Sequence, residues 1–381
     1  MKKILFDLSV CQPIGNSKFH GGGVYGYIVF EALANKYPND IIAYYDENRF
    51  IPENIKRIIE SKNISVKSVH DSSIIDLFLN KEFCTLYSSL WSKNYYKLSK
   101  YNIPIITTIH GLRVLEMNKD FYESMYAKDT KQYLKTLIKK TPCFNLIQKK
   151  YYNSLQKIFS NKNIRFITVS EHSKASIKYN YPSVDYEKIK VFYSPNTSLD
   201  IELKQEKQEK YYLIVSANRW LKNAYRAILA LDNIFENQKD YVGNVIVTGI
   251  SEKSKLLKGL KHRERFKTKG YVERTELEDL YKNAYALIYP SLNEGFGYPP
   301  IEAMKYGVPV IASSFASITE ICGDAPLYVN PYSIDEIGMR IIELENLEIY
   351  SRKKRLSKSQ YQVVKNRQEE DLAKLVEYIV Q

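Results

Sequence analysis

Two glutamates, Glu294 and Glu302, flank a glycine turn and are the side chains of this sequence best placed for chemistry. An apolar run at 286–289 predicts a buried parallel strand before the turn. Pro299 and Pro300 suit the first turn of a helix behind it. The start of such a helix presents unpaired N–H groups and a positive dipole end, which attract phosphate. Because carboxylates repel phosphate, we expect both glutamates to accept hydrogen bonds from hydroxyls, such as those of a sugar and a ribose on either side of a diphosphate.

A second loop, residues 216–223, carries two cations ahead of another predicted helix. Arg219 would bind a diphosphate through its planar guanidinium group, and Lys222 would act as a point charge. Both loops also have simpler interpretations. The first is a helix with an acid in its first turn, and the second is a pair of surface cations.

A third candidate is the glycine cluster near the N-terminus, between a strand predicted at 3–10 and a helix predicted at 27–35. Gly21, Gly23 and Gly26 satisfy G-x-G-x-x-G, with an aspartate about 20 residues further on, which is the pattern of a dinucleotide-binding oxidoreductase. That fingerprint should open directly after the strand, whereas several residues intervene here. The dinucleotide site therefore stays an alternative.

The stretch from residue 290 to 304 reads Pro-Ser-x-x-Glu-Gly-Phe-Gly-x-Pro-Pro-x-Glu-Ala-Met, and Gly-Val-Pro-Val-Ile-Ala follows it. This pattern resembles the signature of retaining GT-B glycosyltransferases of family 4, the glycosyl transferases group 1 of the E-x7-E type. The resemblance is strong over residues 210–350 and weak before them. It implies that Glu294 binds the hydroxyls of the donor sugar and that Glu302 binds the nucleotide ribose.

The resemblance also implies a role for His110, which ends a strand predicted at 105–109, where ligands bind in open α/β sheets. In the family a histidine here lines the reaction centre, often as His-Asp, whereas this chain has Gly111 in the second position. A hydrogen-bonded structural histidine is the alternative. We expect the catalytic residues to be His110, Glu294, Arg219 and Lys222. The donor-binding residues implied are Gly22, Gly23, Ser216, Asn223, Val272, Gly295, Phe296, Gly297, Tyr298 and Glu302.

The composition describes a soluble globular protein, with 44% hydrophobic and 26% charged residues and no apolar run near the roughly 20 residues that span a bilayer. The N-terminus has an acid where a signal peptide would be apolar. The four cysteines form no C-x-x-C pair, which is typical of reduced thiols and favours a cytoplasmic protein. Neither the histidines nor the cysteines show metal-ligand spacing, so no metal site is expected.

The formal net charge of +13 is concentrated in the first half, where residues 1–200 hold 29 Lys and Arg against 18 Asp and Glu. Such a field attracts anionic partners. Two helices predicted at 132–140 and 147–159 place apolar residues on one face and lysines on another. They would suit an anionic membrane surface, although core-facing helices more commonly show this pattern. Nucleic acid is not expected as a partner.

Strands alternate with helices along the chain, which predicts an α/β protein. A polar stretch at 196–210 reads as a linker. The resemblance implies the GT-B fold, with two Rossmann-like domains whose parallel sheets face each other across a central cleft. The N-terminal domain, 1–200, would bind the acceptor, and the C-terminal domain, 201–350, would bind the nucleotide-sugar. A helix at 351–381 would return to the first domain.

The function expected is transfer of a hexose-type sugar, with retention, from a nucleotide-diphospho-sugar to a saccharide or lipid-linked saccharide in bacterial surface polysaccharide or glycolipid assembly. The donor is a substrate, and no cofactor is expected. No Asp-x-Asp occurs, so we expect a metal-independent enzyme. It would be cytoplasmic, with peripheral binding to the inner face of the cell membrane as a further option. The alternatives are a nucleotide-sugar epimerase, a phosphorylase, or a non-catalytic partner of another transferase.

Overall fold

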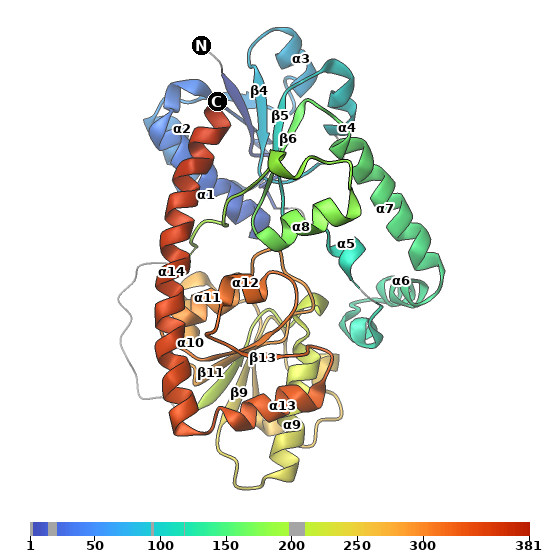
Figure 1. The fold of residues 1–381 in the computed structure, drawn as a ribbon, viewed down its shortest axis with the longest axis vertical. Helices are drawn as coiled ribbons and strands as arrows, with labels where there is room; N and C mark the ends of the chain where they lie inside the picture. The colour runs from blue at the N-terminus through green and yellow to red at the C-terminus, as the bar shows by residue number, and fades with distance from the viewer. Residues whose placement is uncertain (1–2, 14–20, 93–94, 118, 198–209) are drawn as a thin grey trace. The chain divides into compact units, whose positions relative to one another are not determined.

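The structure is a computed structural model that describes residues 3–13, 21–92, 95–117, 119–197 and 210–381. The chain forms two compact units, which we describe separately (Figure 1). Unit 1 consists of Met1–Leu112, Tyr151–Thr197 and Asn366–Gln381, and unit 2 consists of Arg113–Lys150 and Ser198–Lys365. These units differ from the expected domains, because residues 113–150 cluster with unit 2. The linker expected at 196–210 lies almost wholly outside the described residues.

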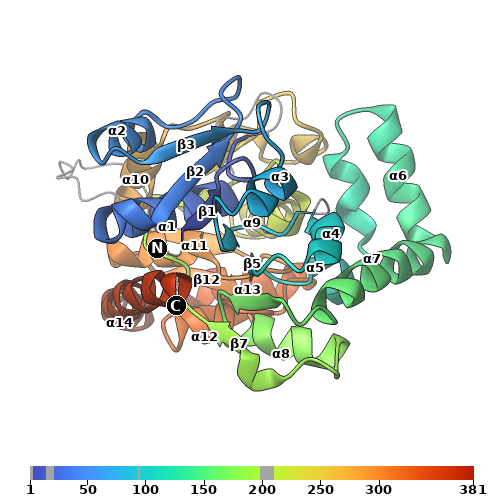
Figure 2. The same cartoon turned by 90° about the horizontal axis from the view of Figure 1, so that it is seen from above.

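Unit 1 contains a seven-stranded sheet in the order β3-β2-β1-β4-β5-β6-β7, and its neighbouring strands are parallel. Its strands are β1 (Ile4–Asp7), β2 (Ile41–Tyr45), β3 (Ser65–Ser68), β4 (Thr85–Ser88), β5 (Ile105–Ile109), β6 (Ile164–Thr168) and β7 (Ile189–Val191). Its helices are α1 (Gly21–Lys36), α2 (Glu53–Ser61), α3 (Ile74–Leu79), α4 (Tyr95–Leu98) and α8 (Glu171–Asn180). Figure 2 shows this sheet and its helices from above.

Helix α1 begins at Gly21, six residues before the start predicted from the sequence, so the glycine cluster lies inside the helix rather than in a loop. The reason is close packing. A Cβ at Gly26 would lie 2.3 Å from Cys11 Sγ and 2.4 Å from Ser89 Oγ, and one at Gly22 would lie 2.5 Å from Leu90 Cδ2. These glycines let the helix approach the segment after β4, which accounts for two of them without any ligand.

Unit 2 contains a six-stranded parallel sheet in the order β10-β9-β8-β11-β12-β13. Its strands are β8 (Tyr211–Ile214), β9 (Asn244–Thr248), β10 (Phe266–Lys269), β11 (Ala286–Tyr289), β12 (Val310–Ser313) and β13 (Leu327–Val329). Counted within each unit, both sheets follow the 3-2-1-4-5-6 order of the Rossmann fold. The expected α/β class with two Rossmann-like parallel sheets is confirmed.

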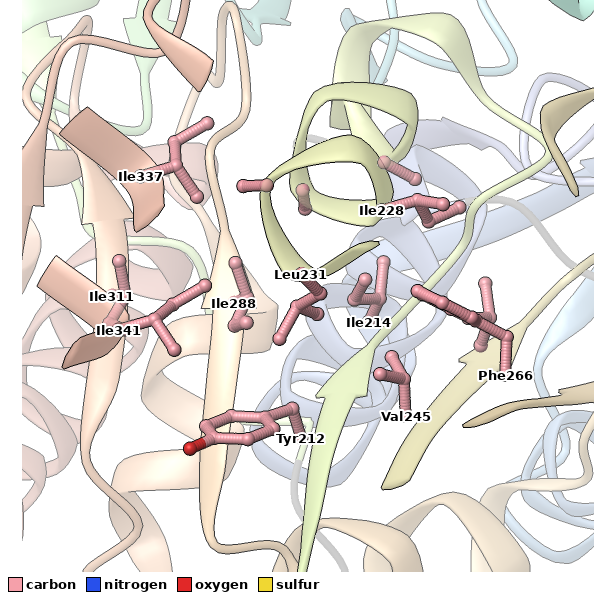
Figure 3. Packing of buried hydrophobic residues seen from close by; sticks show 14 of the residues in the cluster. Tyr212, Ile214, Ile228, Leu231, Val245, Phe266, Ile288, Ile311, Ile337 and Ile341 are labelled. Carbon is pink, nitrogen blue, oxygen red and sulfur yellow. The ribbon is translucent and has the colours of Figure 1, made fainter. Parts of the chain in front are cut away.

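The core of unit 2 lies between this sheet and helices α9 (Ala224–Asn237) and α13 (Ile334–Glu343). Figure 3 shows Ile228 and Leu231 of α9 above the strand residues Ile214 and Ile288. All four side chains are at most 2% exposed. Burying a side chain of this size contributes roughly 1.5–3 kcal/mol, so this packing fixes the strands whose ends carry the site.

The remaining helices of unit 2 are α5 (Arg113–Glu116), α6 (Thr130–Lys140), α10 (Arg274–Asn283), α11 (Tyr298–Lys305) and α12 (Ile318–Cys322). Short 3₁₀ turns lie at Phe121–Tyr126 (η3) and Trp220–Lys222 (η5). Helix α7 (Cys143–Phe159) begins in unit 2 and continues into unit 1. Among the residues described, no helix combines the length and apolar character needed to cross a membrane.

The last helix, α14 (Leu347–Val380), has contacts in both units. In its first half, Lys353 Nζ donates to the carbonyl oxygen of Pro326 at 2.8 Å, within unit 2. In its second half, Asp371 accepts from the backbone N–H of Tyr193 at 2.9 Å, within unit 1. The helix therefore contributes packing surface to each unit.

Candidate functional site

The candidate site lies where β8 and β11 end side by side in the sheet of unit 2. In this strand order the two neighbours lead into loops on opposite sides of the sheet, and ligands bind in the crevice between such loops. The loop after β8 carries Arg219 and Lys222, and the loop after β11 carries Glu294. Arg219, Lys222 and Glu294 thus all lie on loops at the topological switch point.

Glu294 is buried, and its Oε1 atom has three hydrogen-bond donors. Lys222 Nζ lies 2.6 Å from it, Tyr289 Oη 2.7 Å and Ser291 Oγ 2.5 Å. Burial alone would raise the pKa of Glu294, but the positive charges of Lys222 and Arg113 and these hydrogen bonds lower it to about 2. The carboxylate is therefore ionised at neutral pH.

The second oxygen of Glu294, Oε2, is held much less tightly. Arg113 Nη2 lies 3.9 Å from it, and within the described part of the chain this is its one polar contact. A carboxylate oxygen can accept two hydrogen bonds. Glu294 thus has one saturated oxygen that fixes its position and one oxygen that can accept hydrogen bonds from a ligand.

Lys222 is held inside unit 2. Its ammonium group is buried and donates hydrogen bonds to Glu294 and to the hydroxyl of Tyr289, so it holds the Glu294 carboxylate in position. Burial lowers the pKa of Lys222, and the nearby charges of Arg219 and Arg113 act in the same direction, while Glu294 opposes them. The contact of Lys222 with a diphosphate stays a prediction.

Arg219 is exposed, and its side chain makes no hydrogen bond or ion pair with any residue that the structure describes. The charge of Arg219 acts on the neighbouring Lys222, and Arg113 lies 3.9 Å from Glu294 Oε2, so this part of unit 2 holds two guanidinium groups. Arg113 opens helix α5 and was given no role by the sequence analysis. Its position three residues after His110 is the signal that could have identified it.

The loop between β11 and α11 is rigidly held. Ser317 Oγ lies 3.0 Å from the carbonyl oxygens of both Glu294 and Phe296. Gly297 has a φ of 101°, and a Cβ there would lie 2.6 Å from Ile318 Cδ1. Helix α11 begins at the next residue, Tyr298, behind the buried Gly295–Gly297 turn, and Pro299 and Pro300 in its first turn have no N–H to donate. The positive end of the helix dipole lies there, and phosphate binding at this place stays a prediction.

Glu302 is also buried, and Arg274 Nη1 donates to its Oε1 at 2.7 Å. Arg274 also bonds the buried Glu278. Helix α10 begins at Arg274, and Glu278 faces inward from it. Arg274 is a second residue that the sequence analysis missed, and it fixes the carboxylate expected to bind the ribose.

The other donor-binding residues predicted in unit 2 have varied surroundings. Asn223 is buried and its Nδ2 donates to the carbonyl oxygens of Pro290 and Pro331 at 2.9 and 2.6 Å. Its side chain thus ties the loop after β8 to the loop after β11. Ser216 has a φ of 53° directly after the end of β8, and Val272 lies just before α10, half-buried. Donor contacts of these residues stay predictions.

The three candidates of unit 1 lie at the carboxyl edge of its own sheet. His110 Nε2 lies 2.8 Å from the carbonyl oxygen of Ser89, so this nitrogen carries the proton. The Tyr25 ring packs edge-on against the imidazole, with centroids 4.8 Å apart. Gly22 and Gly23 stand in the first turn of α1. A role of these residues toward a sugar stays a prediction.

The sequence analysis did not identify one cluster of possible metal ligands. Asp46, Glu47 and His70 place potential metal-ligand atoms within 4.8 Å of one another in unit 1. His70 Nε2 lies 2.9 Å from Asp46 Oδ1, and this contact raises the pKa of His70. The ion pair between His70 and Asp46 accounts for the cluster, in which Glu47 and His70 are exposed and Asp46 is partly buried.

Comparison with known proteins shows which proteins this chain resembles. Residues 197–378 match the family model "Glycosyl transferases group 1". The chain is 37% identical over 194 residues to the O-antigen chain mannosyltransferase RfbU of Salmonella typhimurium. That alignment covers 49% of this chain and 52% of RfbU, so the chain spans about half the length of this curated relative.

Two solved structures share the fold over nearly the whole chain. Sucrose-phosphate synthase from Thermosynechococcus elongatus superposes with a TM-score of 0.69 at 15% identity, covering 98% of this chain and 97% of its own. HepE from Anabaena, in complex with UDP-glucose, superposes with a TM-score of 0.63 at 14% identity, covering 100% and 98%. The chain therefore has the GT-B fold, and residues 197–378 carry the region that resembles group 1 glycosyl transferases.

Proposed function

We propose that the protein is a glycosyltransferase that moves a hexose-type sugar from a nucleotide-diphospho-sugar to a saccharide acceptor, with retention at the anomeric carbon. The observation that carries this proposal is the state of Glu294. One oxygen is saturated by Lys222, Tyr289 and Ser291, and the other is open beside Arg113. An ionised, fixed carboxylate next to a helix N-terminus suits a sugar hydroxyl beside a phosphate.

The charge state of Glu294 also indicates what it does not do. With a pKa near 2, the carboxylate is a poor general acid at neutral pH. It would accept hydrogen bonds from the donor sugar and stabilise the positive charge that develops at the anomeric carbon. Arg219, Arg113 and the N-terminus of α11 would stabilise the departing diphosphate electrostatically, without a metal ion.

The group 1 match and the similarity to RfbU, an O-antigen chain mannosyltransferase, support a role in surface polysaccharide assembly. Nucleoside-diphospho-mannose is therefore the first donor to test. HepE is crystallised with UDP-glucose, which makes UDP-sugars the second choice.

The test has two steps. Thermal stability is measured with UDP, GDP, dTDP, ADP and NAD in turn, because a ligand at 100 times its dissociation constant adds about 2.7 kcal/mol. Release of nucleoside diphosphate is then followed after adding acceptor. Stabilisation by one diphosphate and acceptor-dependent release support the proposal. Stabilisation by NAD alone would favour the dinucleotide alternative, and donor binding without release would favour a non-catalytic partner.

Peripheral binding to an anionic membrane is proposed as well, and the exposed face of α6 supports it. Leu134 and Ile138 are about half exposed, at 53% and 49%, and lysines such as Lys131 and Lys135 accompany them on the same helix. An apolar stripe with basic neighbours is typical of interfacial helices. Co-sedimentation with vesicles containing phosphatidylglycerol, but not with pure phosphatidylcholine vesicles, is the expected outcome.

A further inference from the structure

Two adjoining pockets with different linings lie beside the Glu294 site in unit 2. The first has a volume of about 310 Å³ and is lined mainly by apolar atoms, including those of Val114, Met117, Phe144 and Ile147. Arg113 lines it too and lies 3.9 Å from Glu294 Oε2. An apolar pocket thus begins one side chain away from the oxygen that can bind the donor sugar.

The second pocket, of about 590 Å³, is basic. Five cationic residues contribute to its lining, against the two acids Glu123 and Asp129. The cationic residues are Lys128, Lys131, Lys135, Lys139 and Arg219. Such an excess of positive charge around a hollow attracts a phosphate or diphosphate group.

The two pockets share a wall. Glu123, Lys139, Trp220 and Leu221 line both of them. Lys139 Nζ lies 2.5 Å from Glu123 Oε1 and 5.5 Å from the centroid of the Trp220 ring. Trp220 Nε1 in turn donates to the buried Asp120 at 2.6 Å. The wall is therefore built of fixed side chains, with apolar space on one side and positive charge on the other.

We propose that these pockets bind the non-carbohydrate end of an amphiphilic acceptor, in which a hydrocarbon chain is joined to the saccharide through a phosphate or diphosphate. The hydrocarbon would occupy the apolar pocket, and the phosphate would occupy the basic one. The inference rests on the proposed function, since it places the acceptor of that same reaction. Arg113 links the apolar pocket to the donor site, because it lines that pocket and lies 3.9 Å from Glu294 Oε2.

The occupant follows from the charges and from where the pocket opens. A free sugar would leave the apolar pocket without a matching group, and a hydrocarbon alone would leave the lysines without one. Ile147 lines the pocket while remaining 44% exposed, so the pocket opens to the solvent-facing side of α7. A long chain can therefore enter there and continue beyond the pocket.

Farnesyl phosphate, kept below its critical micelle concentration, is a suitable probe, and the two tryptophans of the chain offer an optical signal. In a Trp91→Phe background, Trp220 alone reports on the shared wall. We expect farnesyl phosphate to change this fluorescence saturably, and to bind at least tenfold more tightly than farnesol or inorganic phosphate. Farnesol binding as tightly as farnesyl phosphate would overturn the role of the basic pocket.

Two matched pairs of variants locate the binding. Ile147→Asp places a carboxylate at the apolar pocket, and Leu146→Asp makes the same change at a neighbour that is 68% exposed and does not line it. Lys135→Ala removes a lysine of the basic pocket, and Lys149→Ala removes one outside both pockets. We expect at least tenfold weaker binding in Ile147→Asp and several-fold in Lys135→Ala, with the two controls near wild type.

Equal weakening by Leu146→Asp and Ile147→Asp would indicate adsorption to the helix surface and would overturn the pocket proposal. Stabilisation by nucleoside diphosphates is measured on the same preparations. If it persists while farnesyl phosphate fails to bind, only this inference is wrong. If no nucleoside diphosphate stabilises the protein, the proposed function is wrong.

Discussion

The buried pair of Glu294 and Lys222 makes a quantitative prediction about stability. The pKa of Glu294 falls from the ordinary 4.5 to about 2 in the folded protein. Each pKa unit corresponds to about 1.4 kcal/mol, so the ionised carboxylate contributes about 3 kcal/mol to folding. A pKa lowered by folding gives stability that is present above pH 4.5 and is lost as the pH falls toward 2. Removing one partner of a buried pair costs a similar amount, about 3–5 kcal/mol.

We therefore expect Glu294→Gln to destabilise unit 2 by about 3 kcal/mol at pH 7, since Lys222 is left buried without its counter-charge. The assay is urea unfolding in the Trp91→Phe background, where Trp220 reports on unit 2. The difference in the free energy of unfolding between Glu294→Gln and its parent should decrease below pH 4.5. The double variant Lys222→Met with Glu294→Gln should recover part of the loss, because no unpaired charge remains buried.

The comparison between variants is necessary because other carboxylates titrate in the same range. Glu236 and Asp46 also have lowered pKa values, owing to contacts with Lys261 and His70 respectively. These groups are common to the parent and the variant, so their contributions cancel in the difference. A difference in unfolding free energy under about 0.5 kcal/mol at pH 7 would refute the prediction of a buried ionised pair. A difference that stays constant from pH 7 to pH 3 would refute it as well.

Three further outcomes are expected. Arg113→Ala should lower kcat/KM by about 10–100-fold while unfolding stays within about 0.5 kcal/mol, because the side chain is 37% exposed and faces the open oxygen of Glu294; a matching loss of stability would count against a ligand-binding role. Gly297→Ala should cost about 1–3 kcal/mol in urea unfolding, and adding Ile318→Val should recover only the steric share, since the positive φ persists. Asp120→Ala should cost about 3–5 kcal/mol, because Arg226 would lose its buried partner at 2.6 Å; a Tm unchanged from wild type would contradict this.

Much of the fold could be predicted from the sequence, because local patterns carry it. The strand expected at 286–289 and the strand expected at 105–109 are observed with these bounds. The glycine turn that follows the strand at 286–289 is observed as well, and so is the short helix with two prolines in its first turn. In these segments the apolar period, the glycines and the prolines all favour the same conformation, so no tertiary contact overrides them.

The start of α1 shows where local patterns fail. Gly21, Gly22 and Gly23 have low helix propensity, which favoured a loop. The structure includes all three in the helix. A Cβ at Gly21 would meet nothing within 4 Å, but the absent side chain of Gly22 allows close contact with Leu90, after β4. That contact joins segments almost 70 residues apart, and no local pattern contains it.

The contacts between side chains within the site could not be predicted from the sequence for the same reason. Spacing identified Glu294 and Lys222 separately, but not that they bond each other across 72 positions. Arg113 and Arg274 escaped notice because each stands alone in the sequence. Their importance comes from the carboxylate that the fold brings to them, at 3.9 and 2.7 Å.

The pairing of Glu294 with Lys222 changes how charge is distributed in the site. These two groups neutralise each other and are buried, so they add little net charge for a ligand. Arg113 and Arg219 then supply two positive charges on more exposed side chains, which matches the two negative charges of a nucleoside diphosphate linked to a sugar. Because Glu294 is ionised by its own buried partner, it can contact the sugar without drawing these arginines away from the phosphates. One loop can thus hold a carboxylate for hydroxyls and leave its cations for phosphate.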